Sequence, residues 1–331
     1  MRPATATAEP RAHHFAPQCW LAGFTDTGEK DGRLWVTDLK RQKQWPSNPE
    51  NTAHRRDFYR LSDADSRDPV AFEKLFSRIE GAFAPLLKAM NERPRGPYRD
   101  EWESLFMYMA VQWMRVPAFR PMLLRVADGI NRQFLEEALA TPETWGAWLK
   151  KLGIPPDAPG AEYDKMVEFE RGHQDTLSAE PEWFLYRGFK AVEGVASCLA
   201  KRHWRASISM PGGFIGSDNP VVMDGPKGQE VGFKSAAIVL FPVSRHVLLY
   251  GANCPVTPLP VTYRRVAAHN TFMMLTADEQ VYSQVPDFYW LDENGKCQTD
   301  WKLFSREKLV QSGTLGLPIA MYALAGGATS T

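Results

Sequence analysis

The chain has 331 residues, and its 39 Lys and Arg residues balance its 39 Asp and Glu residues, so the formal net charge is zero. Hydrophobic residues make up 44%, and 18 Phe, 11 Trp and 10 Tyr supply ample apolar surface to bury, which excludes disorder over most of the chain. A neutral chain does not attract polyanions over long distances. The charge therefore gives nucleic-acid binding no support, although it does not exclude it.

The cysteines and the termini indicate a cytoplasmic protein. The cysteines lie far apart in the sequence, which excludes a zinc ribbon or a paired redox motif and fits a reducing compartment. Residues 1–12 are small and polar, without the apolar core of a signal peptide, and we expect them to be disordered. No run of 18 apolar residues predicts a transmembrane helix, so we expect no membrane partner. The four cysteines are Cys19, Cys198, Cys254 and Cys297.

The first predicted elements are strands. The apolar runs CWLAGF (19–24) and RLWVTDL (33–39) flank a turn-prone segment, which indicates a hairpin, or a short helix followed by a strand. Residues 41–68 are polar and rich in Pro and Asn, so they predict a long loop.

Helices are predicted from residue 69 onward. Apolar residues recur at steps of three and four between Phe72 and Leu87, which indicates a helix with one buried face. A second helix is predicted over about 100–116, because Pro117 disfavours helical backbone at the residue before it. Further helices are predicted over 120–138, 142–152, 160–177 and 182–203.

Strand character returns after residue 204. Short β-branched or apolar runs between 205 and 251 are separated by Gly, Pro and Asn, which indicates strands. A helix is predicted over 261–277 and a final strand at QVYS (280–283), followed by a weakly specified tail over 312–331.

Strands at both ends with helices between them predict an α+β fold. The simplest arrangement is one domain over 13–311, in which N-terminal strands join a C-terminal mixed or antiparallel sheet. A helical insertion (about 69–205) then precedes a β-rich part (about 206–300). The alternative is a helical domain over 69–205 and a separate β-rich domain over 206–331.

Common catalytic signatures are absent. The sequence has no G-x-S-x-G, no H-E-x-x-H, no Walker A loop, no kinase motif set, and no G-x-G-x-x-G that opens a helix. A dinucleotide-binding fold is therefore not indicated.

Two polar positions in the first half could carry chemistry. His14 follows His13 and precedes Pro17, and a histidine can act as base, acid or metal ligand near neutral pH. Paired histidines near a polar start are more often plain surface residues. Glu80 lies in the apolar stripe of the first predicted helix, where a carboxylate needs a partner unless it reaches solvent.

Gln112 and Arg115 lie one turn apart on the buried face of the second predicted helix. A guanidinium there needs a carboxylate or an anionic ligand, so an ion pair between Glu80 and Arg115 and an anion-binding role are both open.

Two further polar groups lie in the β-rich part. Asp218 and Asn219 belong to a Ser-Asp-Asn-Pro segment between predicted strands, which is either a turn initiator or a site held on a rigid sheet. Asn270 follows His269 in a predicted helix and could line a cleft or lie at the surface.

The order of these motifs resembles a bacterial family known as domain of unknown function 4238. The resemblance spans most of residues 13–283 and supplies no reaction. It implies that His14, Glu80, Gln112, Arg115, Asp218 and Asn219 belong together. The motifs that carry it are H-[YF]-x-P at His14–Pro17, an I-E step at Ile79-Glu80, Q-x-x-R-x-P at Gln112–Pro117 and S-D-N-P at Ser217–Pro220.

Two functions follow from these residues. The first is a hydrolase-type enzyme, such as a nuclease or phosphodiesterase, in which His14, Glu80 and Asp218 do acid–base chemistry or hold a divalent metal as cofactor. Its substrate, a small molecule or a phosphate-bearing one, would be bound by Gln112, Arg115, Asn219 and Asn270. The second is a non-catalytic module that binds an anionic small molecule or peptide. The same residues could also form a purely structural buried network.

Overall fold

The computed structural model describes residues 12–59, 70–159, 161–172, 181–224, 232–256 and 260–312. The expected N-terminal disorder up to residue 11 and the C-terminal tail from residue 313 lie outside this part. The chain divides into two compact units, a larger one formed by residues 1–117 and 185–331 and a smaller one formed by residues 118–184.

Two four-stranded antiparallel sheets organise the larger unit, with strand orders β3-β2-β10-β6 and β5-β9-β8-β7. The first sheet joins two strands from the start of the chain to two from its second half, as predicted, so the fold is α+β. The strands of the first sheet are β2 (Leu34–Asp38), β3 (Lys43–Ser47), β6 (Gly216–Ser217) and β10 (Gln280–Ser283). Those of the second are β5 (His203–Ile208), β7 (Val222–Asp224), β8 (Ile238–Pro242) and β9 (Val247–Ala252).

Two short ribbons complete the strand inventory of the described residues. β1 (Ala12–His14) pairs with β4 (His54–Arg56), and β11 (Trp290–Leu291) pairs with β12 (Cys297–Gln298), both antiparallel. The first ribbon matters for the site because it places His14 opposite His54.

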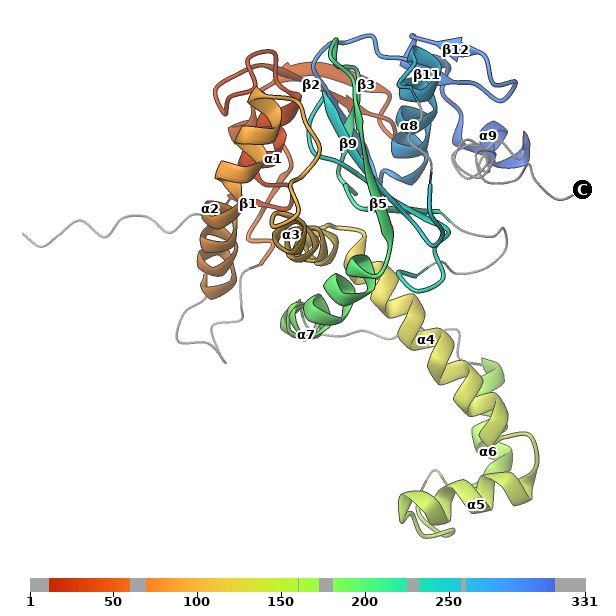
Figure 1. Ribbon diagram of the computed structural model, residues 1–331. Helices are drawn as coiled ribbons and strands as arrows, with labels where there is room; N and C mark the ends of the chain where they lie inside the picture. Colours follow the sequence, from red (N-terminus) through yellow and green to blue (C-terminus); the bar gives the residue numbers. More distant parts are fainter. Residues whose placement is uncertain are drawn as a thin grey trace, which may run out of the picture. The chain divides into compact units, whose positions relative to one another are not determined.

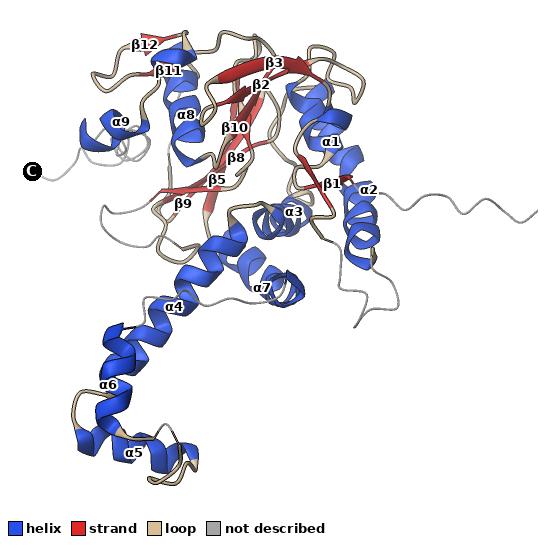
Figure 2. Cartoon of the chain, turned by 180° about the vertical axis from the view of Figure 1, so that it is seen from behind, coloured by secondary structure: helices blue, strands red, loops and turns tan. Residues whose placement is uncertain are grey.

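Helices cover the sheets of the larger unit from two sides. In both views α1 and α2 lie on one side of the sheets and α8 lies on the other (Figures 1 and 2). The α-helices are α1 (Gln18–Leu21), α2 (Ala71–Glu92), α3 (Trp102–Arg115), α7 (Pro181–Ala200), α8 (Tyr263–Thr276) and α9 (Arg306–Ser312). Short 3-10 turns are η1 (Ala22–Phe24), η2 (Pro49–Asn51) and η3 (Trp301–Leu303).

The smaller unit is helical. It contains α4 (Phe119–Ala138), α5 (Pro142–Leu152) and α6 (Tyr163–Gly172). A capping box between Thr141 and Thr144 begins α5, and Gly153, with φ 69°, ends it in the left-handed conformation that glycine adopts readily. Among the described residues of the whole chain, no helix has the length and apolarity that crossing a membrane requires.

Near the N-terminus the structure decides between two open alternatives and contradicts one prediction. The runs at 19–24 and 33–39 left a hairpin, or a short helix followed by a strand, open; the structure has the helix and strand, since α1 and η1 bury Trp20, Leu21 and Phe24 together and β2 follows. A short apolar run does not distinguish a strand from a buried helical turn. The loop expected over 41–68 contains β3 and β4, whose residues are mostly exposed. Edge strands of this kind tolerate polar residues and proline, here Pro46.

Trp20 fixes α1 against the sheets. Its indole nitrogen donates to the carbonyl oxygen of Pro242 at 2.8 Å, and its ring packs on Phe24 and Phe241. A Cβ atom at Gly216 would lie 2.6 Å from the Trp20 ring, so only glycine fits at that point of β6. Through this contact the sheets position the segment that carries His14 and Gln18.

Candidate functional site

Arg115 is the centre of the first polar cluster. Its side chain is fully buried, and its Nη1 lies 2.8 Å from Oε1 of Glu80. Its Nη2 donates to the backbone carbonyl of His14. The guanidinium also lies 4.5 Å from the centre of the Phe76 ring. The ion pair with Glu80, one of the two alternatives open from the sequence, therefore forms, and both terminal nitrogens of Arg115 have partners.

Local sequence explains why these residues meet. Val116, whose φ and ψ are −73° and 152°, ends α3 directly before Pro117, which leaves Arg115 in the last turn. On α2, Glu80 lies four residues after the buried Phe76 and thus on the same face. The hydroxyl of Tyr59 donates to the backbone carbonyl of Arg115 and ties the segment after β4 to the end of α3.

Hydrogen bonds fix the protonation of the His14 ring. Its Nδ1 lies 3.0 Å from the carbonyl oxygen of Thr52, which can only accept, so Nδ1 carries the proton. Nε2 is then an acceptor for the amide of Gln18 at 3.1 Å. Burial lowers the pKa of His14, His54 at 5.3 Å between ring centres lowers it further, and Glu80 opposes this change. The His14 ring is therefore uncharged around pH 7, and its Nε2 can accept a proton.

Glu73 is a member of this cluster that the sequence interpretation missed. It lies seven residues, or two turns, before Glu80 on α2. Burial raises its pKa, Arg115 lowers it in part, and the charge of Glu80 raises it again. Its Oε2 is buried and has no hydrogen-bond partner among the residues described. The charge of one guanidinium thus acts on two carboxylates that lie in different environments, an arrangement typical of acid–base sites. The seven-residue spacing is the sequence signal that could have found it.

Gln112 and Cys19 lie at the edges of the cluster. Gln112 is 1% exposed, as its helix position predicts, and neither polar atom of its amide has a partner within the described part of the chain. Burial raises the pKa of the Cys19 thiol to about 11, and Glu80 adds to this. The thiol is therefore protonated at neutral pH and is a poor nucleophile.

Asp218 and Asn219 bind backbone rather than the Arg115 cluster. The Asp218 carboxylate accepts from the amides of Asp278, Glu279 and Gln280 at 2.8, 2.7 and 2.8 Å. Burial raises its pKa to about 6, although the three amides favour the charged form. The Asn219 amide donates to the carbonyl of Thr276 at 3.1 Å, so the two residues join the end of β6 to the turn between α8 and β10.

Asn270 also binds backbone. Its Nδ2 donates to the carbonyls of Gly213 and Tyr289, each at 2.8 Å, and its Oδ1 accepts from the amide of Ile215 at 3.2 Å. The seven residues expected to form one site are therefore divided between two environments. His14, Glu80, Gln112 and Arg115 lie at the helical cluster, whereas Asp218, Asn219 and Asn270 fasten the β-rich part.

One pocket borders both environments. It has a volume of about 300 Å³, and we call it the β3–β4 pocket. Thr52 and His54, the neighbours of the His14 ring, line one part of it, and Asp218 lines another. The full lining is Phe15, Val36, Arg41, Trp45, Asn51, Thr52, Ala53, His54, Arg55, Asp218, Glu279 and Gln280.

Two exposed arginines, Arg41 and Arg55, line this pocket and give it positive charge. The Arg55 guanidinium lies 5.8 Å from the ring centres of Phe15 and Phe58, and Arg41 lies 3.8 Å from the Asp38 carboxylate. Of the acidic lining residues, Asp218 is held by backbone amides and Glu279 lies 3.5 Å from Lys40. The pocket can therefore hold an anionic group beside the Trp45 ring.

The residues proposed from sequence as metal ligands do not fit a metal ion. Within the described ranges, no group of three or more His, Cys, Asp and Glu side chains could hold one. Glu80 is paired with Arg115, and the Asp218 carboxylate is occupied by backbone amides. His14, Glu80 and Asp218 thus do not assemble a divalent-metal site.

Comparison with known proteins identifies the family. A search of curated proteins and a search of solved structures each gave no match. The model of the family described as protein of unknown function (DUF4238) matches residues 12–287, a range that contains the Arg115 cluster, the β3–β4 pocket and Asn270. Because that match covers most of the sequence, the chain belongs to the DUF4238 family.

Proposed function

We propose that the chain is a hydrolase-type enzyme that acts on an anionic substrate by acid–base chemistry of His14 and the carboxylates of α2. One observation carries the proposal. A single buried guanidinium, that of Arg115, binds both the Glu80 carboxylate and the backbone of His14. A neutral imidazole and a carboxylate are thereby held together where both side chains are only partly buried.

His14 would act as the general base. Its Nε2 has an unprotonated lone pair, and its lowered pKa keeps it so at neutral pH. Glu80 would stabilise the imidazolium that forms, because it favours the charged ring. The Gln18 amide suits both states, since it can donate to the neutral ring or turn its oxygen toward the protonated one.

Glu73 would act as the general acid, because its raised pKa favours the protonated form. In the proposed step, water attacks the electrophilic centre of an ester and gives a proton to Nε2 of His14. The bond to the leaving oxygen breaks, and that oxygen takes the proton of Glu73. Proton transfer from His14 through solvent then restores Glu73. Arg115 positions these groups, since its guanidinium is buried and paired.

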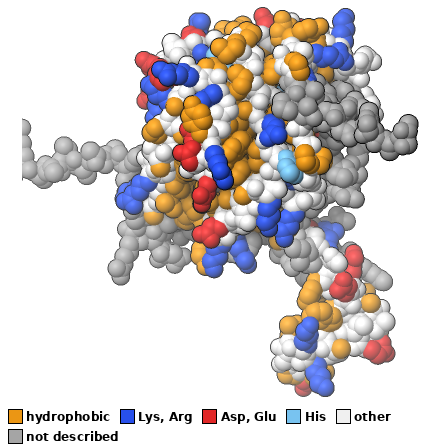
Figure 3. Space-filling model, in the orientation of Figure 1, with side chains coloured by type: hydrophobic (Ala, Val, Ile, Leu, Met, Phe, Trp, Pro, Cys, Tyr) orange, Lys and Arg blue, Asp and Glu red, His pale blue; other side chains and the backbone are white. Residues whose placement is uncertain are grey.

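The β3–β4 pocket supports an anionic, phosphate-bearing substrate of small size. Arg41 and Arg55 would bind the anionic group, and the partly exposed Trp45 ring would cover a planar part of the ligand. A phosphodiesterase is the form of hydrolase that best fits this lining. Acidic and basic side chains are mixed over the face of the larger unit in Figure 3, which favours a small molecule over a long nucleic acid.

Localisation in the cytoplasm belongs to the same proposal. All four cysteines are free thiols, which fits a reducing compartment.

A non-catalytic module for an anionic small molecule or peptide is the second candidate. It is favoured by the fact that both nitrogens of the His14 ring already have protein partners. In that case the β3–β4 pocket would bind the ligand, and the Arg115 cluster would only stabilise the fold.

The test is hydrolysis of p-nitrophenyl phosphate and bis(p-nitrophenyl) phosphate by the purified chain, with His14→Gln and Glu73→Gln. The exposed His203→Gln and Glu103→Gln serve as matched controls. The proposal expects each site variant to lower kcat at least about 100-fold, and Glu73→Gln to remove the alkaline limb of the pH profile. It is overturned if site and control variants have equal activity. Phosphate-ester binding that requires Arg55, without turnover, would establish the binding module instead.

A further inference from the structure

A second pocket lies on the α8 side of the larger unit. It has a volume of about 340 Å³, and we call it the α8 pocket. It shares no lining residue with the β3–β4 pocket. Its walls come from the end of β5 and the segment after it (208–215), the first turn of α8 with the two residues before it (261–266), and the end of β10 with the segment that leads to β11 (283–289). The volume lies in the range of small-molecule sites.

The floor and the rim of this pocket are both apolar. Phe214, Ile215, Val266 and Phe288 line it and are almost completely buried. Met210, Tyr263, Val285 and Tyr289 line it as well, with exposures of 68%, 65%, 46% and 47%. Four of the thirteen large hydrophobic side chains that are exposed in the described ranges thus gather at one cavity, a clustering typical of binding sites.

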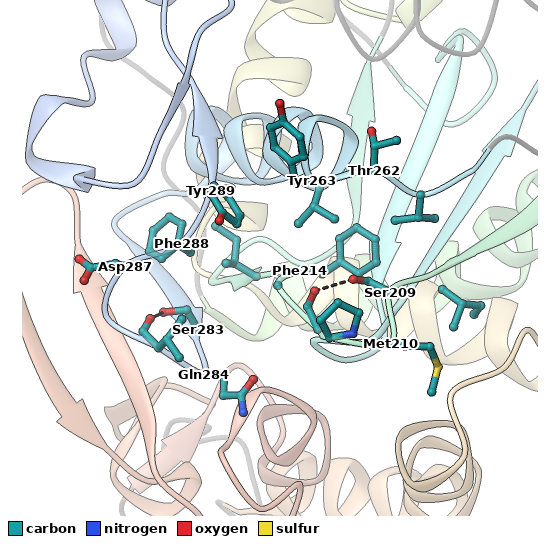
Figure 4. Close-up of a pocket in the computed structure, with 18 residues that line it drawn as sticks. Ser209, Met210, Phe214, Thr262, Tyr263, Ser283, Gln284, Asp287, Phe288 and Tyr289 are labelled. Carbon is teal, nitrogen blue, oxygen red and sulfur yellow. Dashed lines mark hydrogen bonds between the residues drawn. The ribbon is translucent and has the colours of Figure 1, made fainter.

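Figure 4 shows the arrangement of the side chains. The rings of Phe214 and Phe288 lie on opposite sides of the open space, and Tyr263 and Tyr289 lie along its upper edge. Within the described lining, Asp287 is the only charged residue, and its carboxylate points away from the centre. The chemistry of the cavity therefore suits an uncharged aromatic ring and disfavours an anion.

The pocket is held in shape by buried hydrogen bonds. Asn270 binds the backbone of Gly213, Ile215 and Tyr289, so one amide joins two of the three walls. Gly212 and Gly213 have φ of 82° and 109°, which favour glycine, and they turn the chain beneath Phe214. The Ser209 hydroxyl donates to the carbonyl of Gly212 and closes this turn. A cavity fixed in this way binds without a large ordering cost.

We propose that the α8 pocket binds an uncharged, aromatic small molecule whose ring enters between Phe214 and Phe288. This site is separate from the proposed hydrolase site, and the anionic substrate proposed there does not suit it. The occupant is either an effector or a second substrate group, and in both cases the ring is held by apolar contact with the same four aromatic side chains.

The test uses N-phenyl-1-naphthylamine, an uncharged dye that fluoresces in apolar sites, with the full chain. We expect saturable binding of one dye per chain. The double variant Tyr263→Ala/Tyr289→Ala should weaken the Kd at least about tenfold, because two ring contacts are lost. Val285→Arg, which places a charge at the rim, should weaken it similarly. Tyr186→Ala, an equally exposed tyrosine outside the pocket, is the control and should not change the Kd.

A second probe tests the charge preference. 8-Anilinonaphthalene-1-sulfonate has the same rings and one negative charge, and we expect it to bind this site at least about tenfold more weakly. The proposal is overturned if N-phenyl-1-naphthylamine does not saturate at one per chain, or if the rim variants bind it like the wild type. Equal affinity for the sulfonate at this site would overturn the assignment to uncharged ligands. Ester hydrolysis should be unchanged in the rim variants, so the two proposals fail independently.

Discussion

The ion pair of Arg115 and Glu80 is the contact on which the arrangement of the proposed site depends, and a double-mutant cycle measures it. The Arg115 side chain has no exposed surface, the Glu80 side chain is 24% exposed, and the two charged atoms lie 2.8 Å apart. Arg115→Met keeps the apolar stem but removes the charge and its donors. Glu80→Gln keeps a hydrogen-bond acceptor and removes only the charge.

The expected magnitudes follow from burial. Breaking a fully buried ion pair costs about 3–5 kcal/mol, whereas an exposed pair contributes about 1 kcal/mol or less. Since Glu80 keeps some contact with water, Arg115→Met should lower the free energy of unfolding by about 2–4 kcal/mol and Glu80→Gln by about 1–2 kcal/mol. The double variant should be less destabilised than the sum by about 1–2 kcal/mol.

Urea denaturation of the wild type, the two single variants and the double variant gives the coupling energy. Lys88 and Glu29 form a matched control, since their charged atoms also lie 2.8 Å apart but both side chains are about half exposed. Their coupling should be below about 1 kcal/mol. A coupling between Arg115 and Glu80 within about 0.5 kcal/mol of zero would refute the inference that this pair orders the site.

The pKa of His14, measured by NMR titration, provides a second test, because a change in the stability of the fold does not by itself alter this pKa. Arg115 lowers this pKa and Glu80 raises it. Arg115→Met should therefore raise the His14 pKa, and Glu80→Gln should lower it. Shifts of the opposite sign would show that the imidazole does not sense the pair.

Three further predictions concern the fold around the site. Gly216→Ala should lower the free energy of unfolding by about 1–3 kcal/mol, because the new methyl group would lie 2.6 Å from the Trp20 ring; an unchanged urea midpoint would contradict this packing. Asp218→Asn should cost about 2–3 kcal/mol in thermal denaturation, because three backbone amides lose a charged acceptor. Burial, aided by Arg265, lowers the pKa of His269 to about 3, whereas unfolded His titrates near pH 6.5. Below pH 6.5 the unfolded chain therefore binds a proton that the folded chain does not, and stability should fall by up to about 1.4 kcal/mol per pH unit down to about pH 3. His269→Gln should flatten that part of the curve of urea-derived stability against pH, and an unaltered slope would contradict it.

The long helices and the α+β architecture could be predicted because their signals extend over many residues. The apolar stripe of α2 and the proline after α3 each specify an element with little help from the rest of the chain. The four residues of α1 are too few for a period to show, and β3 is a polar edge strand whose partner is needed to recognise it. Those elements depend on tertiary contacts such as that between Trp20 and Gly216.

Some residues of the candidate site could likewise be predicted from the sequence, and others could not. Helix spacing alone predicted that Gln112 and Arg115 are buried neighbours, and both are 1% exposed. The sequence could not show which polar residues bind backbone. An aspartate such as Asp218 or an asparagine such as Asn270 can stabilise a turn, join two segments or act in an active site, and its residue type is the same in each case. Glu73 was missed because a glutamate in the first turn of a helix is usually solvated. Its spacing of seven residues from Glu80 was the available signal, and its burial, together with the effect of Arg115 and Glu80 on its pKa, distinguishes it from a solvated glutamate.

The division between backbone-binding and cluster residues decides which variants can reveal function. Asp218 holds the turn before β10, and β10 pairs with both β2 and β6, so loss of its carboxylate disturbs the first sheet and the wall of the β3–β4 pocket together. Lost activity in Asp218→Ala would therefore not identify a catalytic carboxylate. Arg55 is exposed, and its guanidinium lies over the rings of Phe15 and Phe58 without an ion pair among the described residues. Arg55→Met should thus leave the urea midpoint unchanged while it weakens phosphate-ester binding, and a loss of stability without a loss of binding would place the anionic substrate elsewhere.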